Sequence, residues 1–154
     1  MPLVKPDLEF VFGLKAKLGD MLVIGDTPEG LRRMIPIESG TFSGRALHGE
    51  VVGGGADWQF VRSDGVTVAE AVYLLRTHDG VLIQVRNRGL RHGPPDVIRR
   101  LTEGDDVDPA EYYFRSSPWF LVPPGAYDWL NRDVFVATGA RYKNAIELWF
   151  YRVT

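Results

Sequence analysis

Glycine and proline recur along the whole chain, and their spacing limits most strongly what this sequence can fold into. The 17 glycines and 10 prolines are spread through all 154 residues rather than collected in one linker. Between them lie short segments rich in valine, isoleucine and aromatic residues, which favour β-strands. Because glycine and proline interrupt helices, this punctuation predicts many short strands joined by tight turns. With no internal repeat, residues 1–154 are expected to form a single domain.

Alternation of apolar and polar residues predicts the individual strands. The runs with this pattern cover residues 8–18, 21–24, 31–37, 112–122, 134–138 and 146–153, with a bend or bulge at Gly13 and an interruption at Pro118. A proline-initiated helix is expected at residues 94–101 and one helical turn at 127–131. Roughly eight to ten strands with one or two short helices predict an antiparallel barrel or a curved sandwich.

A hairpin is predicted at His78-Asp79-Gly80, between two alternating runs. A three-residue loop pairs Thr77 with Val81 and separates apolar from polar residues better than a two-residue loop would. In this register Tyr73 and Asn87 point toward the interior.

A second hairpin is predicted at Asp64-Gly65, where the loop length decides the orientation of an aromatic strand. A two-residue turn directs Trp58, Phe60 and Arg62 inward, whereas a three-residue turn directs them outward. We favour the two-residue turn, because it buries the aromatic side chains rather than Gln59.

The glycine run 53–55 is expected to form a bend at a barrel mouth that delivers Asp57 and Trp58. It does not match a dinucleotide-binding or P-loop pattern, and the chain also lacks the nucleophile-elbow and zincin motifs. The three histidines, His48, His78 and His92, are scattered, so we expect no metal site and no cofactor.

Charge and cysteine content exclude further classes. Eighteen basic and 20 acidic side chains are interspersed and give a formal charge of -2, which argues against nucleic acid as a partner. The absence of cysteine excludes disulfides and thiolate chemistry, so a cytoplasmic location is expected. The first residues lack the apolar core of a signal peptide, and no apolar run approaches the ~20 residues that span a bilayer, so no membrane partner is expected.

Polar residues within otherwise apolar strands form the candidate site. Trp58 and Tyr73 would provide stacking surface, and an arginine would pair with an anionic ligand group. Any single arginine is more often a surface or structural ion-pair residue, so the interpretation rests on the group, for which Arg33 is a further candidate. The ligand-binding residues we predict are Asp57, Trp58, Arg62, Tyr73, Asn87, Tyr113, Arg115 and Asn131.

A series of short motifs resembles, in order, the family known as domain of unknown function 3237. The similarity runs from about Leu8 to Val153. The motifs are Gly-x-x-x-x-Ile-Pro-Ile at 30–37, Thr41-Phe42-Ser43-Gly44, Gly54-Gly55-Ala56-Asp57-Trp58, Asp64-Gly65, Asp79-Gly80, Asn87-Arg88-Gly89, Tyr112-Tyr113-Phe114-Arg115, Trp129-Leu130-Asn131 and Phe135-Val136-Ala137.

The resemblance implies a closed or nearly closed, calycin-like or lipocalin-like β-barrel that is often a homo-oligomer, with a polar-lined cavity and no assigned activity. The family pattern often has arginine where this chain has Val72, glycine at Ser39 and an acidic residue at Leu121. Chemistry that pairs that arginine with that carboxylate would be lost here.

The sequence is interpreted in favour of one role, with two alternatives. The first is binding of a small organic molecule, such as a carboxylate, inside the barrel. The second is an isomerase or hydrolase of secondary metabolism or aromatic catabolism, in which Asp57 or Tyr113 beside an arginine transfers the proton. The third is a structural or oligomerisation domain with a filled interior. A lumen of several hundred Å³ would favour binding, whereas a filled lumen would favour the structural role.

Overall fold

The computed structural model describes residues 1–154 and consists mainly of β-strands. The strands are β1 (Leu8–Leu18), β2 (Leu22–Thr27), β3 (Gly30–Gly44), β4 (His48–Val61), β5 (Thr67–Thr77), β6 (Leu82–His92), β7 (Tyr113–Leu121), β8 (Val134–Tyr142) and β9 (Ala145–Val153). One α-helix, α1 (Pro95–Thr102), and two 3-10 turns, η1 (Pro109–Glu111) and η2 (Asp128–Asn131), complete the chain. The predicted helix at 94–101 and helical turn at 127–131 are therefore present.

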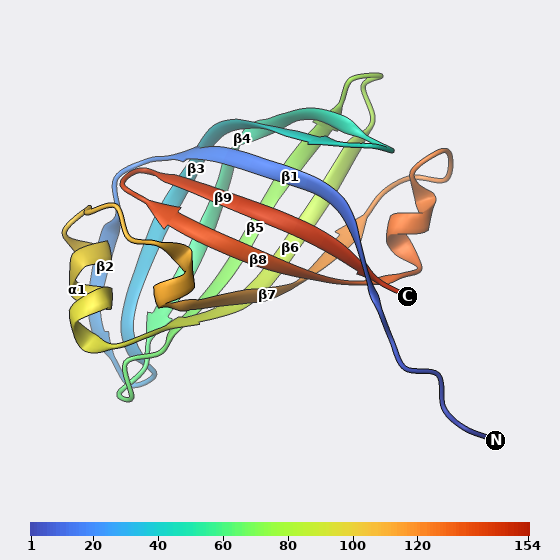
Figure 1. Cartoon of the computed structure of the whole chain (residues 1–154). Coiled ribbons are helices and arrows are strands. Elements are labelled where there is room, and N and C mark those ends of the chain that lie inside the picture. Colours follow the sequence, from blue (N-terminus) through green and yellow to red (C-terminus); the bar gives the residue numbers. More distant parts are fainter.

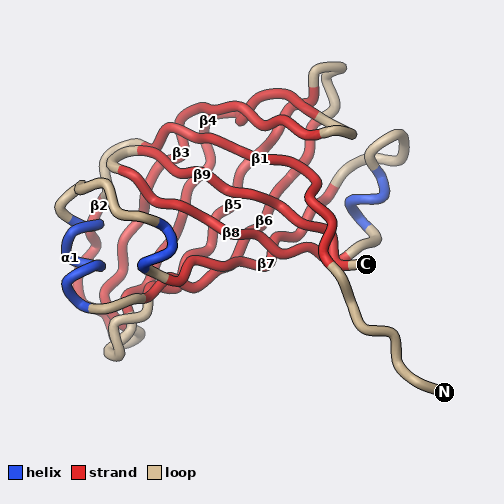
Figure 2. Tube along the Cα trace, viewed as in Figure 1, coloured by secondary structure: helices blue, strands red, loops and turns tan.

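The sheet closes into a barrel, as Figures 1 and 2 show. Its strand order is β1-β9-β8-β7-β6-β5-β4-β3-β2, and an additional pairing of β1 with β3 completes the circle. Eight antiparallel strands therefore surround the interior, and β2 lies outside the closed ring, against the first half of β3. The closed antiparallel barrel is confirmed, and the curved sandwich is excluded.

β3 can serve two neighbours because it is 15 residues long. Its first half, from Gly30 to Met34, pairs with β2, and its second half, from Ile37 to Gly44, pairs with β1. The strand was expected to end at residue 37, but it continues through Glu38-Ser39-Gly40 with a register shift against β4 between Ile37 and Gly40. A bulge bends a strand without ending it, which is why these residues do not stop β3.

β7 and β8 separate after a short ladder. Only two residue pairs join them, Arg115 with Thr138 and Ser116 with Ala137. Pro118 follows within β7 and has no amide hydrogen to donate, and it remains paired with Asn87 of β6. The proline therefore lies within a continuous strand whose opposite edge is unpaired beyond Ser116.

The hairpin between β5 and β6 is the one predicted. The amide of Thr77 donates to the carbonyl of Val81 at 2.9 Å, which closes a three-residue loop, and Gly80 has a φ of 89°. In this register Tyr73 and Asn87 are buried and face the lumen. Both inward orientations are confirmed.

The hairpin between β4 and β5 differs from our prediction. The amide of Arg62 donates to the carbonyl of Val66, so the loop has three residues rather than two. Trp58, Phe60 and Arg62 consequently face outward, while Gln59, only 1% exposed, faces inward. The prediction was wrong because it assumed that the aromatic residues would be the buried ones. The strand instead buries a hydrogen-bonded amide.

The glycine run 53–55 lies within β4, where the register against β5 shifts between Val52 and Ala56. Gly54 has a φ of 105°, and a Cβ on Gly55 would lie 2.5 Å from the Cβ of Tyr73. The run is thus a bulged bend that lets β4 approach β5 closely.

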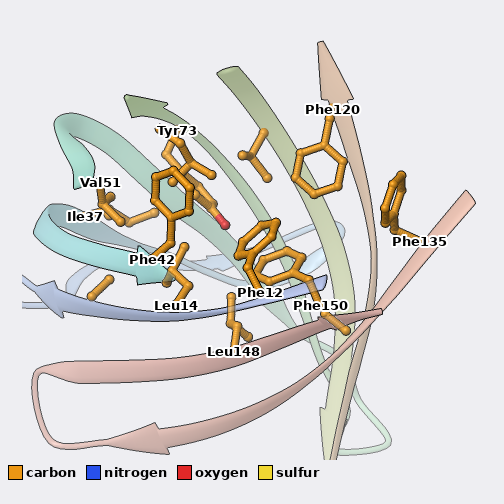
Figure 3. Packing of buried hydrophobic residues seen from close by; sticks show 14 of the residues in the cluster. Phe12, Leu14, Ile37, Phe42, Val51, Tyr73, Phe120, Phe135, Leu148 and Phe150 are labelled. Carbon is orange, nitrogen blue, oxygen red and sulfur yellow. The ribbon is translucent and has the colours of Figure 1, made fainter. Parts of the chain in front are cut away.

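Aromatic side chains fill much of the lumen (Figure 3). Phe12 stacks on Phe150 with ring centroids 4.4 Å apart, and Phe42 and Phe120 meet Phe12 edge to face at 5.5 and 6.1 Å. Phe135 extends the cluster toward Trp129 of η2. Each buried phenylalanine contributes on the order of 2 kcal/mol through removal of apolar surface from water. None of the helices is both long enough and apolar enough to cross a bilayer.

Candidate functional site

A small pocket with a mainly apolar wall lies inside the barrel, where β4, β6 and β8 each direct one charged side chain inward. Its volume is about 40 Å³. Apolar residues from β1, β3 and β9, including Leu14, Ile37 and Leu148, form part of its wall. The polar part of the wall consists of Asp57, Gln59, Tyr73, Arg91 and Arg141.

A hydrogen-bonded chain connects Arg33 to Asp57 through Gln59. Arg33 Nε donates to Gln59 Oε1 at 2.8 Å, and Gln59 Nε2 donates to Asp57 Oδ2 at 2.7 Å. The strand period explains the arrangement, because Asp57 and Gln59 are two residues apart on β4 and Arg33 is directly opposite Gln59 on β3. The amide orients the carboxylate and keeps it at a distance from that guanidinium.

Arg91 and Arg141 belong to the inward-facing residues near the ends of β6 and β8. The Arg91 guanidinium lies 5.7 Å from the ring centroid of Phe114, a cation–π distance. Arg141 Nη1 donates to the carbonyls of Tyr142 and Ala145 at 2.7 and 2.9 Å, which holds the side chain at the β8–β9 turn. Both of these hydrogen bonds come from Nη1, so they leave the other two guanidinium nitrogens of Arg141 free.

Tyr112 supports Arg141 from the segment that follows η1. Its hydroxyl oxygen accepts a hydrogen bond from the Arg141 amide at 2.9 Å, and its side chain is buried. Burial raises the pKa of Tyr112, so the hydroxyl keeps its proton. Tyr112 therefore positions the end of β8 without adding charge.

The pocket carries an excess of positive charge. Two guanidinium groups, those of Arg91 and Arg141, line the pocket with one carboxylate, that of Asp57, which gives a formal charge of +1 when all three are ionised. Arg33 is linked to that carboxylate through Gln59. Burial lowers the pKa of each arginine, and repulsion from Arg33 and Arg141 helps to lower that of Arg91 to about 10. A cluster of this kind gains from an anion that neutralises it.

The pKa values of Asp57 and Tyr73 are both raised. Burial raises the pKa of Asp57, although the hydrogen bond from Gln59 and the charges of Arg91, Arg141 and Arg33 oppose that shift. Burial and the charge of Asp57 raise the pKa of Tyr73. A buried carboxyl group whose pKa is raised is a candidate for proton transfer.

Four buried polar atoms on the inner wall have no hydrogen-bond partner in the protein. They are Asp57 Oδ1, Tyr73 Oη, Asn87 Oδ1 and Ser116 Oγ. Asp57 and Asn87 lie on either side of Ala71, with which both are paired across the sheet, and Tyr73 is two residues further along the same strand. Unpaired buried polar atoms are rare and costly, and they gather here around a small side chain.

The eight predicted site residues are distributed over three parts of the molecule. Asp57 and Tyr73 line the interior pocket, and Asn87 faces the same lumen. Asn87, Tyr113 and Arg115 also border an open groove of about 1050 Å³, which runs over β6 and β7 and reaches the buried side chains of Ser116 and Phe120. Of the eight predicted residues, only Asp57 and Tyr73 line the small interior pocket.

The other predicted residues have structural or surface roles. Trp58 is 39% exposed and its ring lies 5.1 Å from the Arg32 guanidinium. Arg62 is exposed and forms an ion pair with Asp64. The Asn131 side chain bonds both the amide and the carbonyl of Val122, at 2.9 and 2.8 Å, so it fastens η2 to the end of β7.

Four residues of the polar cluster, Gln59, Arg91, Tyr112 and Arg141, were absent from the predicted site. Arg91 follows Asn87 and Gly89 at every second position of the correctly predicted hairpin, so the alternation along β6 predicts that Arg91 also faces inward. Arg141 was missed because β8 was expected to end at Thr138, whereas the strand continues to Tyr142. Gln59 was missed through the wrong loop length.

Two of the three departures from the family pattern, Val72 and Leu121, lie on the outer surface. Leu121 is exposed and borders the groove. Val72 of β5 is paired with Arg86 of β6, and β6 lies between Val72 and Leu121. The two positions are therefore separated by β6 and lie outside the arginine cluster. The interior pocket does not depend on them.

Comparison with known proteins places the chain among relatives of the same length. The family model described as "Protein of unknown function (DUF3237)" matches residues 6–153. A UPF0311 protein of Bradyrhizobium diazoefficiens is 37% identical over 147 residues, covering 96% of each chain. A UPF0311 protein of Clostridium acetobutylicum is 37% identical over 147 residues, covering 95% of this chain and 93% of the relative.

Solved structures share the barrel. A conserved protein of unknown function from Rhodopseudomonas palustris superposes with a TM-score of 0.95 at 34% identity, covering 99% of this chain and all of the other. A β-barrel-like protein from Acinetobacter baumannii gives 0.87 at 36% identity over 99% of both chains. An enzyme from Penicillium herquei gives 0.73 at 21% identity, covering 100% and 98%, a likeness of fold alone. The chain therefore belongs to the DUF3237 family of proteins of unknown function, also named UPF0311.

Proposed function

We propose that this protein binds a small organic carboxylate inside its barrel. The observation that carries the proposal is that Arg91 and Arg141 line a pocket with only one carboxylate, that of Asp57, to which Arg33 is linked through Gln59. A guanidinium presents donors in a planar fork that matches a carboxylate. A bound carboxylate would offset the +1 charge of the pocket, so binding and relief of repulsion act in the same direction.

The pocket volume limits the ligand. About 40 Å³ is far below the several hundred Å³ that would favour binding, so on volume alone the filled lumen favours the structural role. Binding is supported by the charge of the pocket, which has room for a few small heavy atoms only. Much of the remaining lumen is occupied by the aromatic core. The proposed ligand is therefore an anion of acetate or propionate size, and a larger molecule would have to open the barrel mouth.

Isothermal titration calorimetry with sodium acetate and sodium propionate tests the proposal, with chloride at equal ionic strength as the reference. We expect saturable binding that Arg141→Met weakens about tenfold or more, because a charge-assisted hydrogen bond contributes about 1.5–3 kcal/mol. The matched control is Arg115→Ala, which removes an arginine from the outer groove only. Carboxylate binding lost with Arg115→Ala and kept with Arg141→Met would move the site to the groove.

An enzymatic role is a second candidate, favoured by Asp57. Its raised pKa and its place beside the arginine cluster suit a group that moves a proton on a bound carboxylate, as an isomerase requires. The fold likeness to an enzyme from Penicillium herquei is compatible with this role. The test is solvent hydrogen exchange: NMR in D₂O would detect loss of the α-proton signal of bound propionate, and Asp57→Asn would abolish that loss.

Homo-oligomerisation is favoured by a separate feature, the edge strand β2. Leu22, Val23 and Ile24 are each more than half exposed, and the strand has a neighbour on one side only. An exposed apolar edge pairs readily with another strand, so we propose a second copy of this chain as the partner. Light scattering after size-exclusion chromatography is expected to show a dimer or larger assembly that Val23→Lys dissociates, and a monomeric wild type would refute it.

A further inference from the structure

We infer that the ligand of this pocket is a small hydroxy-carboxylate, with its carboxylate on the arginines and its hydroxyl between Asp57 Oδ1 and Tyr73 Oη. The inference rests on the proposed carboxylate binding and names the class of carboxylate. Both atoms are buried, both lack a protein partner and both belong to residues that line the arginine pocket. A ligand that had only a carboxylate, bound to the arginines, would leave Asp57 Oδ1 and Tyr73 Oη without hydrogen-bond partners.

The chemistry of the two atoms specifies the missing group. Asp57 Oδ2 already accepts from Gln59, so Oδ1 is the free oxygen of that carboxyl group. Tyr73 keeps its phenolic proton, so its hydroxyl is able to donate. An alcohol both donates and accepts one hydrogen bond, so it satisfies an acceptor on Asp57 and a donor on Tyr73 at once. A methyl group in the same place satisfies neither.

The register supports a built site rather than a packing defect. Tyr73 is only 5% exposed and lies on β5, two residues from Ala71, which is opposite Asp57. The small side chain of Ala71 separates Asp57 from Asn87, whose Oδ1 is also unpaired. Polar groups are thus kept on the wall around a small residue, although apolar side chains at these positions would avoid the cost of burying them.

Glycolate and propionate provide the test, because they differ only by a hydroxyl in place of a methyl group. By calorimetry we expect glycolate to bind at least about tenfold more tightly than propionate, since a buried polar group left unpaired weakens binding by that order. In the Tyr73→Phe variant, the preference for glycolate over propionate should fall several-fold, while the affinity for propionate stays the same. Tyr113→Phe, a tyrosine on the outer face, is the matched control and should keep the full preference.

The outcomes separate this inference from the function on which it rests. Equal binding of glycolate and propionate would overturn the hydroxyl site and leave carboxylate binding intact. Absence of binding for both would overturn carboxylate binding itself, and the hydroxyl site with it. Should Tyr73→Phe fail to fold, judged by circular dichroism, the comparison of the two ligands on the unmodified protein decides alone.

Discussion

The two ends of this barrel use the same inward strand positions for opposite purposes. Toward η2 the lumen is filled by phenylalanines that stack and meet edge to face, among them Phe12, Phe120 and Phe150. Toward α1 and η1 the equivalent positions hold Asp57, Arg91 and Arg141. The first arrangement removes apolar surface from water, whereas the second removes charge from water, at a cost.

The difference shows which end stabilises the fold and which end is available for chemistry. A charged cluster that is imperfectly paired is retained in a core when binding or catalysis needs it, because apolar residues of similar volume would be at least as stable. The closed barrel supplies the rigid wall that such a cluster requires. Substitutions at the two ends should therefore change stability in opposite directions.

The largest expected effect is at the aromatic end. Phe150→Ala removes a fully buried ring that stacks on Phe12 at 4.4 Å. The free energy of unfolding should fall by about 3–5 kcal/mol through lost transfer energy and the cavity left behind. Urea denaturation followed by circular dichroism measures it. A loss below about 1 kcal/mol would mean that this end does not provide the stabilising core.

Arg91→Met should have the opposite sign at the polar end. Burial and repulsion from Arg33 and Arg141 lower the pKa of Arg91 to about 10, so its charge is unfavourable in the fold. The methionine variant is expected to be about 1 kcal/mol more stable to urea and to bind acetate at least about tenfold more weakly. Lower stability together with unchanged acetate binding would show that Arg91 is a structural residue.

Asp57→Asn should change how stability depends on pH. Because burial raises the folded-state pKa of Asp57 above that of the unfolded chain, the folded protein keeps this proton where the unfolded chain has lost it. The free energy of unfolding of the wild type should therefore decrease as pH rises from about 4 through the folded pKa. The asparagine variant lacks this contribution, so its stability relative to wild type should rise across that window. Urea denaturation at a series of pH values measures both curves, and parallel curves would contradict the raised pKa.

The smallest effect is expected for Arg62→Ala, on the outside of the barrel. Arg62 pairs with Asp64 at the tip of the β4–β5 hairpin, and both side chains are about half exposed. Exposed ion pairs contribute little, so neither the unfolding free energy nor acetate binding should change measurably. A marked loss of acetate affinity would return Arg62 to the binding site that the sequence had suggested.

The fold was largely predictable because its signals are local. Alternation and Asp-Gly turns identified the hairpin at residues 78–80 and the inward orientation of Tyr73 and Asn87. The candidate site was predicted less completely, because one additional residue in the loop at Asp64-Gly65 turns the side chains expected inside the barrel to the outside along β4. Propensity favoured burying Trp58 over Gln59, and a tertiary hydrogen bond from Arg33 to Gln59 reversed that preference.

The sequence by itself determined an antiparallel β-barrel, its family and most of its strands, because periodicity and turn chemistry act over a few neighbouring residues. Only the tertiary structure decided which charges share the lumen. Arg33, Asp57, Arg91 and Arg141 lie on four different strands, and their meeting depends on the register of every ladder between them. Register accumulates around a closed sheet, so the charge of the pocket is a property of the whole barrel.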